Sequence, residues 1–344
     1  MNASSRPPTL APPAATLPRR WLRRVTALES LRRYGWHPLR ADLLAGLTVA
    51  TVAVPQAMAY AVLAGVPAQY GLYTAMVMTT IGSLFTSSKQ LINGPTNVIS
   101  IAVLSALAWV PLEERLSAAL ALGALVGAVQ LLITLLRIGD LTRYISHSVV
   151  VGFTAGASLL LVLAQTHNLC GWAAQGSAHD HFLLRVYQTW TQGGLPHGPT
   201  LAIGLGSIGG VLGLRWLKRR LGWPLFPELL LIVVFAALGV ALLGLEARGV
   251  AVVGEIPRSL PAFAVPELDL VRARRLTESA VAIATLGLLE ALAMAKHLSS
   301  ITGQRLDLNQ QCLSEGLANL GGSFFQCIPG SGSLTRSAIN QQAG

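Results

Sequence analysis

The chain has 344 residues, of which 52% are hydrophobic and 12% charged, and its mean hydropathy is +0.56. A soluble domain carries about 25% charged residues, so this composition excludes soluble globular domains and also disorder over most of the chain. The formal net charge is +10. Its Lys and Arg residues gather at the ends of apolar runs and form no continuous basic face, so we expect no nucleic-acid partner. Three scattered cysteines show no zinc-binding spacing, so we expect no metal.

Apolar runs of about 20 residues, the length that crosses about 30 Å of hydrocarbon, recur from residue 43 onward. They cover 43–63, 70–86, 96–110, 116–136, 147–165, 199–217, 224–245, 277–297 and 310–328, and a last segment begins near Ser333. The third run and the last are short and begin at clusters of Gly, Pro and Ser. Because the runs do not alternate between apolar and polar residues, we predict an all-α polytopic membrane protein.

The placement of Lys and Arg predicts the orientation of these spans. Residues 1–40 are expected to form a disordered, basic, cytoplasmic N-terminus, and the basic connection at 215–220 falls on the same side of the membrane. The long connection 166–198 falls outside and carries one arginine, Arg185. The arginines at 272–275 conflict with this topology, because they fall outside too. We expect a multi-pass protein of the plasma (inner) membrane.

Two stretches of the chain repeat. Residues 56–60 (QAMAY) in the first span resemble 290–294 (EALAM) in the eighth, and 82–85 (GSLF) at the end of the second resemble 322–325 (GSFF) at the end of the ninth. Each closing tetrad is followed by a short polar linker and a half-length helix. A duplication of about seven spans places the second copy in the opposite sense, which is the inverted repeat of many secondary transporters.

The N-termini of paired half-helices offer free backbone N–H groups and about half a positive charge each, which suits an anion. Pro95 suits the first turn of one half-helix, and Asn93, Ser331 and Ser333 are expected to cap the two helices. Arg336 lies in the first turn of the other half-helix, where a charge within the membrane costs about 2.5–3.5 kcal/mol. An anion that binds there explains this arginine.

Other interpretations remain open for the charged and polar residues within the spans. Arg336 either binds an anion, snorkels to an interface, or pairs with Glu290 or Glu315. Glu290 is a proton-titrating carboxylate, a sodium ligand or half of a structural ion pair. Gln56 and Tyr60 share one face of the first span and are either donors to a ligand or part of a packing face beside a proline kink.

Several motifs occur in order from about residue 40 to the end, at 42–46, 54–60, 70–73, 93–96, 151–153, 290–296, 316–319 and 335–340. With them the chain resembles the SulP family of sulfate permeases and related anion transporters. The resemblance implies fourteen spans in two inverted halves of seven, a core domain that moves against a gate domain, and usually a cytoplasmic STAS domain. The sequence departs from the family in four ways. It ends inside the tenth span, and Gln311 stands where the family more often has Glu. The second span lacks the usual prolines over 73–85, and Ser146 replaces the usual Pro before His147.

The resemblance also implies where the anion lies, namely between the third and tenth spans. The anion-site residues expected on this basis, together with their flanking residues, are Gln56, Tyr60, Pro95, Thr96, Ser333, Thr335 and Arg336. Glu290 matches the acidic position that is linked to cation coupling.

The expected domains are a core domain from the first repeat (41–136), a gate domain (137–246), an extramembrane connection (247–276) and a truncated core domain from the second repeat (277–344). We expect secondary active transport of an inorganic anion, with sulfate first, coupled to a proton or sodium ion, and no other cofactor. The expected partners are the anion, the lipid bilayer and, at full length, a second copy. Alternatives are transport or exchange of bicarbonate, chloride or a dicarboxylate, an uncoupled anion channel, or an inactive membrane fragment. No Gly-x-Ser-x-Gly motif supports an enzyme.

Overall fold

The computed structural model describes residues 35–137, 147–173, 175, 182–222, 228–252 and 259–343. The expected N-terminal tail and most of the connection 137–146 lie outside these residues. The described elements follow in the order α2 (Trp36–Leu63), α3 (Ala68–Phe85), β1 (Ile92–Gly94), α4 (Asn97–Ala106), α5 (Arg115–Leu135), α6 (His147–Cys170), α7 (Phe182–Gln192), α8 (Gly198–Leu221), α9 (Glu228–Leu242), η3 (Leu245–Arg248), α10 (Leu270–Thr302), α11 (Leu308–Ser323), β2 (Ser331–Ser333) and α12 (Leu334–Ala343).

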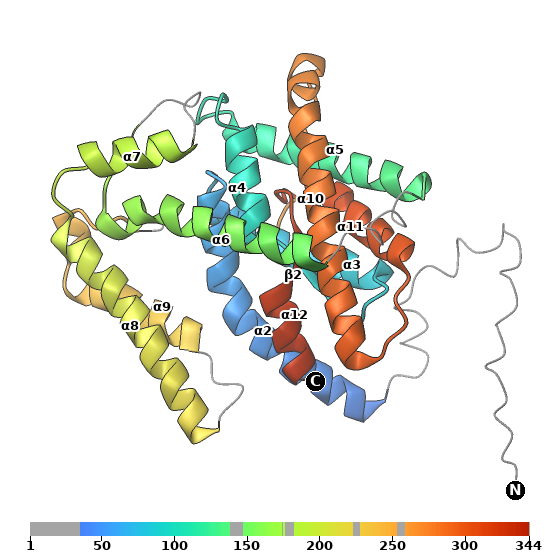
Figure 1. Cartoon of the computed structure of the whole chain (residues 1–344), viewed down its shortest axis with the longest axis horizontal. Coiled ribbons are helices and arrows are strands. Elements are labelled where there is room, and N and C mark those ends of the chain that lie inside the picture. The colour runs from blue at the N-terminus through green and yellow to red at the C-terminus, as the bar shows by residue number, and fades with distance from the viewer. Residues whose placement is uncertain are drawn as a thin grey trace, which may run out of the picture.

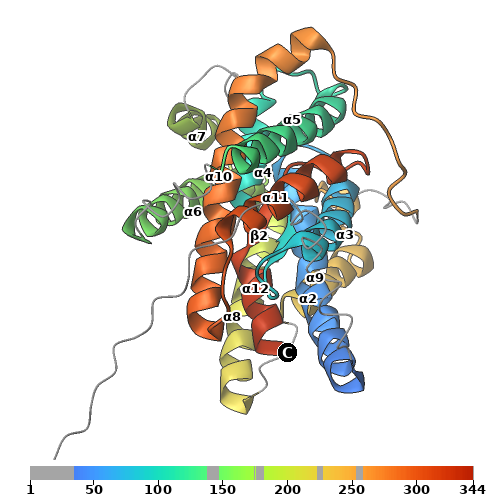
Figure 2. The same ribbon diagram turned by 90° about the vertical axis from the view of Figure 1, so that its right-hand side faces the viewer.

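The order of elements at the start of the chain recurs at its end. The series α2, α3, β1, α4 is matched by α10, α11, β2, α12. Strands β1 and β2 pair antiparallel, with Ile92 opposite Ser333 and Gly94 opposite Ser331. Helices α4 and α12 therefore leave the strand pair in opposite directions, as Figures 1 and 2 show. The two units run in opposite senses, which is the relation that an inverted repeat requires.

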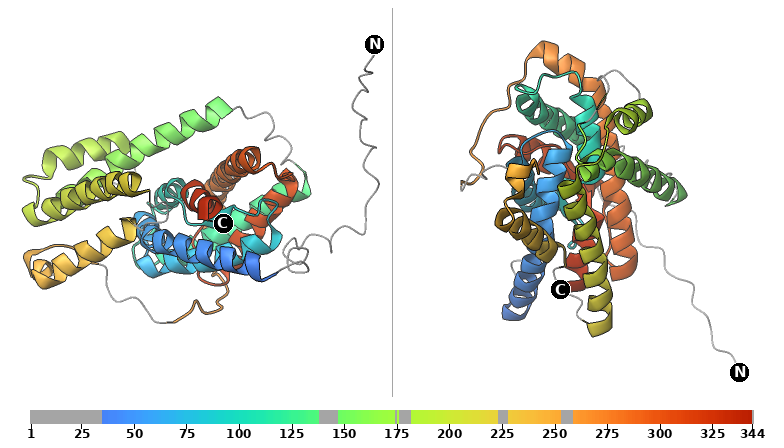
Figure 3. Two further views of the ribbon diagram at one scale, coloured as in Figure 1. Left: turned by 90° about the horizontal axis from the view of Figure 1, so that it is seen from below. Right: turned by 90° about the vertical axis from the view of Figure 1, so that its left-hand side faces the viewer.

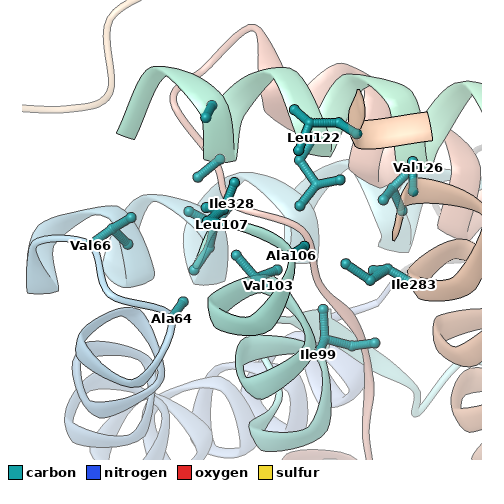
Figure 4. Packing of buried hydrophobic residues seen from close by; sticks show 14 of the residues in the cluster. Ala64, Val66, Ile99, Val103, Ala106, Leu107, Leu122, Val126, Ile283 and Ile328 are labelled. Carbon is teal, nitrogen blue, oxygen red and sulfur yellow. The ribbon is translucent and has the colours of Figure 1, made fainter. Parts of the chain in front are cut away.

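The two units also exchange packing partners. Helix α4 packs against α10 of the other unit, and α12 packs against α2. The largest hydrophobic cluster joins residues of both units around α4 (Figure 4). Ile99 and Val103 of α4 contribute to it together with Leu122 of α5, Ile283 of α10 and Ile328 before β2. A half-length helix buries enough apolar surface in this way to stay fixed although it does not cross the membrane.

Glycines spaced four residues apart on these helices differ in their contribution to helix packing. At Gly127 on α5 a side chain would collide with the backbone of Leu320 on α11, so this glycine allows the two helices their close approach. A Cβ at Gly210 would meet a side chain of α9. Gly152 and Gly156 on α6 have no atom within 4 Å of a Cβ position. Gly152 and Gly156 therefore mediate no close helix contact among the described residues.

Helices α6 to α9 lie mainly to one side of the paired units (Figure 3). Helices α8 and α9 bury none of their residues within the described chain. A helix that is apolar on all sides suits a lipid environment. The long connection predicted at 166–198 contains helix α7, which the sequence analysis did not predict.

By length and composition, the described helices that can cross a membrane are Pro38–Leu63, Arg115–Leu135, Gly198–Leu221 and Leu270–Thr302. Asn97–Ala106 and Glu228–Leu242 are shorter apolar helices.

The arginines that conflicted with the predicted topology lie at the start of α10. This helix begins at Leu270, seven residues before the predicted span (277 − 270), and so extends into the predicted connection. Arg272 donates to Glu114 at 2.5 Å, and the guanidinium of Arg275 lies 5.3 Å from the ring centre of Trp109. Because these partners lie between α4 and α5, the arginines serve to fix the end of α10, and their positions do not report the orientation.

Candidate functional site

The site forms where the two strands lead into the half-helices. Thr96 is the N-cap residue of α4, with extended backbone angles (φ −125°, ψ 157°). At the start of α12, Oγ of Ser333 accepts from the Arg336 N–H at 3.5 Å, as predicted for a cap. Asn93 and Ser331 lie within the strands, so the predicted capping by these two residues is wrong. Pro95 precedes the helix that it was expected to open.

Two glycines let the strands and the arginine approach one another. Gly94 has φ +154°, a conformation that residues with a side chain rarely adopt. A Cβ there would lie 3.0 Å from Nη2 of Arg336. A Cβ at Gly330 would lie 2.5 Å from the Gly94 carbonyl oxygen. Neither glycine was predicted as a site residue, although Asn-Gly-Pro and Gly-Ser-Gly-Ser mark special backbone conformations.

The side chain of Arg336 is the central feature of the site. It is 1% exposed. One guanidinium nitrogen, Nη2, donates to the backbone carbonyl of Pro95 at 2.9 Å, whereas Nε and Nη1 are buried without a hydrogen-bond partner. Among the described residues, neither Glu290 nor Glu315 lies within ion-pair distance of it. The snorkelling and ion-pair interpretations therefore do not describe this arginine.

Glu290 approaches the same place from α10. It is half-buried, and its Oε2 accepts from the Thr96 hydroxyl at 3.1 Å. Tyr60 on α2 interacts electrostatically with Glu290 and with Arg336. A cationic side chain, a carboxyl group and a phenol thus meet around the starts of α4 and α12, although they come from distant parts of the sequence.

The other predicted residues differ in their placement. Gln56 lies on α2, which packs against α12, and its Oε1 is buried without a partner. Ser331 is fully buried and its hydroxyl donates to the Gly287 carbonyl at 2.7 Å, which fixes β2 against α10. Thr335 is exposed. Pro95 and Ser333 therefore contact Arg336 directly, Tyr60 and Glu290 interact with it electrostatically, and Thr335 is exposed.

This arrangement is suited to charge recognition. Two helix N-termini and an arginine with unused donors present positive potential to one place. Among the residues that the structure describes, no group of three His, Cys, Asp or Glu side chains is arranged to hold a metal ion. The hydroxyl of Thr96, at the start of α4, connects the carboxyl of Glu290 to the half-helix.

An all-α membrane protein whose broken helices face each other across two inverted repeats has the fold of a secondary transporter. A family model described as the sulfate permease family matches residues 39–344. The chain therefore belongs to the sulfate permease family. It is 32% identical over 324 residues to the chloroplastic sulfate transporter 4.1 of Arabidopsis thaliana, covering 91% of this chain and 46% of the relative. It is 32% identical over 317 residues to a probable sulfate transporter of Mycobacterium tuberculosis, covering 91% of this chain and 55% of the relative.

Solved structures show the same fold. The murine anion transporter Slc26a9, in its inward-facing state, superposes with a TM-score of 0.82 at 24% identity, covering 96% of this chain and 58% of that one. The transmembrane domain of the cyanobacterial bicarbonate transporter BicA gives 0.75 at 23% identity, covering 90% and 79%. The family and these relatives are transporters, not enzymes. The chain spans about half the length of the curated relatives that it matches.

Proposed function

We propose that the protein formed by this chain transports an inorganic anion by a secondary active mechanism, with sulfate as the first substrate to test. The observation that carries the proposal is the buried Arg336, whose Nε and Nη1 have no partner. A buried charge without a partner costs several kcal/mol (~3–5) unless a ligand compensates it. The Arabidopsis relative is named a sulfate transporter and the mycobacterial relative a probable sulfate transporter, and these names support sulfate.

The charge of the site favours a divalent anion. Each helix N-terminus contributes about half a positive charge, and the guanidinium contributes one, so the site offers about two positive charges once a bound cation neutralises Glu290. Sulfate carries two negative charges, whereas bicarbonate and chloride carry one each. The likeness to the bicarbonate transporter is at 23% identity and supports the fold alone.

The position of Glu290 supports coupling of the anion to a cation. Its carboxyl group accepts a hydrogen bond from Thr96, the N-cap residue of α4. A proton or sodium ion that neutralises Glu290 therefore changes the electrostatic potential at the anion site. A proton or sodium ion on Glu290 offsets one of the two negative charges that sulfate brings, so the core carries less charge across the membrane field than it would with the anion alone. In this proposal α2 to α5 and α10 to α12 form the moving core, and α6 to α9 belong to the gate.

Alternating access then proceeds by movement of the core against the gate. We place the protein in the plasma membrane with its N-terminus in the cytoplasm, because the basic segment 215–220 at the end of α8 lies on the same predicted side as the N-terminal arginines. Binding has to remain modest, because an anion that is held too tightly is not released on the other side.

The test is sulfate binding and uptake by the protein at its full natural length in proteoliposomes. Arg336→Gln removes the charge and is expected to weaken sulfate binding about 10- to 150-fold, the effect of losing a charged hydrogen bond of about 1.5–3 kcal/mol. Arg272→Gln is the matched control, because Arg272 pairs with Glu114 away from the site. Equal losses in both variants, or none in either, would contradict the proposal.

Coupling is tested separately in the same vesicles. Glu290→Gln is expected to reduce uptake driven by an imposed proton or sodium gradient, while exchange of labelled against unlabelled sulfate persists. The gradient that loses its effect identifies the coupling ion. Concentrative uptake that this variant leaves unchanged would remove Glu290 from the coupling mechanism.

A further inference from the structure

A second buried carboxyl group, Glu315, lies outside the contacts that form the anion site. It belongs to α11, which packs between α3 and α5 and also touches α10. Its side chain is 0% exposed. Oε1 accepts from Nε2 of Gln311, one helical turn earlier, at 3.2 Å. Oε2 is buried and has no hydrogen-bond partner.

The side-chain amide of Asn93 faces this carboxyl group from β1. Asn93 is 3% exposed, and its Nδ2 is also buried without a hydrogen-bond partner. Two buried polar groups from different elements therefore meet without forming a bond of acceptable geometry. Buried polar atoms in native proteins are nearly always paired, so this double exception needs an explanation.

The charges around Glu315 do not favour its ionised form. Among the described residues, no Lys, Arg or His lies within ion-pair distance of it. The titratable group that interacts with it is Glu290 on α10, another acid. The neighbouring helices present uncharged groups to α11. On α5 this group is the Gln130 amide, which accepts a hydrogen bond from Asn319. On α3 it is Tyr73, which belongs to the same hydrophobic cluster as Ala318.

A bound proton resolves the exception at Glu315. A neutral carboxyl group donates through Oε2–H and removes the cost of a buried charge, which amounts to several kcal/mol (~3–5). The nitrogen and oxygen of an Asn amide exchange places by a half-turn of the side chain. After that turn Oδ1 of Asn93 can accept from Oε2–H of Glu315, which gives the carboxyl group a partner.

We propose that Glu315 is a second proton-binding site of the core, loaded in the arrangement seen here and emptied when Asn93 moves with strand β1. On emptying, the O–H bond breaks, the electron pair stays on the carboxylate and water takes the proton. Asn93 adjoins Gly94, where an added Cβ would lie 3.0 Å from Nη2 of Arg336, so in this proposal proton binding at Glu315 is linked to anion binding. Only this link between the proton and the anion rests on the proposed function.

Infrared spectroscopy tests proton occupancy directly. The full-length protein in lipid is expected to show the carbonyl band of a protonated carboxyl group, shifted in D2O, at neutral pH. Glu315→Gln should remove this band, whereas Glu290→Gln should leave it in place. A band that survives Glu315→Gln, or one that is missing from the wild-type protein, would overturn the assignment.

The link to the anion is measured through sulfate affinity as a function of pH. Each linked proton contributes up to a tenfold change in the dissociation constant per pH unit. Glu315→Gln resembles the loaded form and should lower this dependence by one proton per anion, while keeping the wild-type affinity at low pH. An unchanged pH dependence in a folded Glu315→Gln variant would refute the link.

The outcomes also separate this proposal from the function on which it rests. If the wild-type protein binds no sulfate at any pH, the proposed function is wrong, and the infrared experiment still decides whether Glu315 carries a proton. If Glu315→Gln fails to fold, the wild-type titration replaces it. Sulfate should then raise the pH at which the band disappears, and an identical titration without sulfate would refute the link.

Discussion

Replacing Gly94 by alanine perturbs the site without removing any of its polar groups. Gly94 has φ +154°, and the new Cβ would lie 3.0 Å from Nη2 and 3.3 Å from Nη1 of Arg336. The guanidinium therefore has to move by a few tenths of an ångström, away from the Pro95 carbonyl that it contacts at 2.9 Å. Because Nη1 is one of the two unpartnered donors, we expect both folding and anion binding to weaken.

The substitution has two effects, one on folding stability and one on anion binding. Backbone strain in this region of φ costs about 1–3 kcal/mol, which lowers the melting temperature by about 2–4 °C per kcal/mol for a domain of 150–250 residues. Misplacing one charged donor removes about 1.5–3 kcal/mol of binding free energy, or about 10- to 150-fold in the dissociation constant. Thermal unfolding in detergent and equilibrium binding of labelled sulfate measure the two effects separately.

Gly303→Ala is the matched control for this prediction. Gly303 is the C-cap of α10 with φ +69°, and a Cβ there meets no atom within 4 Å. The control should lose about 1–2 kcal/mol of stability and keep its sulfate affinity. If Gly94→Ala binds sulfate as tightly as the control does, the guanidinium does not contact the anion and the reasoning fails.

Two further predictions concern the scaffold. Gly127→Ala should destabilise the protein by about 1–3 kcal/mol in thermal unfolding, because the new methyl group meets the backbone of α11. Gly123→Ala is the control and should cost less, because its Cβ would lie 3.4 Å from the nearest atom. Equal losses of stability would contradict the close approach of α5 and α11. In a variant without native cysteines, cysteines introduced at Ile92 and Ser333 should form a disulfide, because these residues face each other across the strand pair. If cysteines at Ile92 and Leu334 cross-link as efficiently as that pair does, the register of the two strands is different.

The charged residues of the site were predictable because each stands out against an apolar segment. Arg336 and Glu290 are costly in a membrane span, and this cost alone identifies them as candidates. The half-helices were also predictable, because Gly, Pro and Ser interrupt otherwise apolar runs. The closing tetrad at 82–85 predicted the end of α3 correctly, since this helix ends at Phe85.

The details of the helix starts were not predictable. The three-residue strands carry no alternation of apolar and polar residues, so the sequence showed only turn residues there. Strand β1 runs through Gly94, which precedes Pro95 and for that reason avoids the helical conformation. Thr96 is also extended, so α4 begins at Asn97, beyond Pro95. Glu315 lies inside the predicted run 310–328, but it was considered only as a partner for Arg336, because its complete burial and its unpartnered Oε2 are visible only in the structure.

The most direct test of the central claim is to locate the bound anion. Selenate is a heavier analogue of sulfate, and a crystal of the full-length protein soaked in it gives an anomalous signal at the selenium position. We expect this signal within hydrogen-bond distance of the Arg336 guanidinium, at the starts of α4 and α12, and its loss in Arg336→Gln. A selenium position elsewhere, or one that persists in the variant, would contradict an anion site at Arg336.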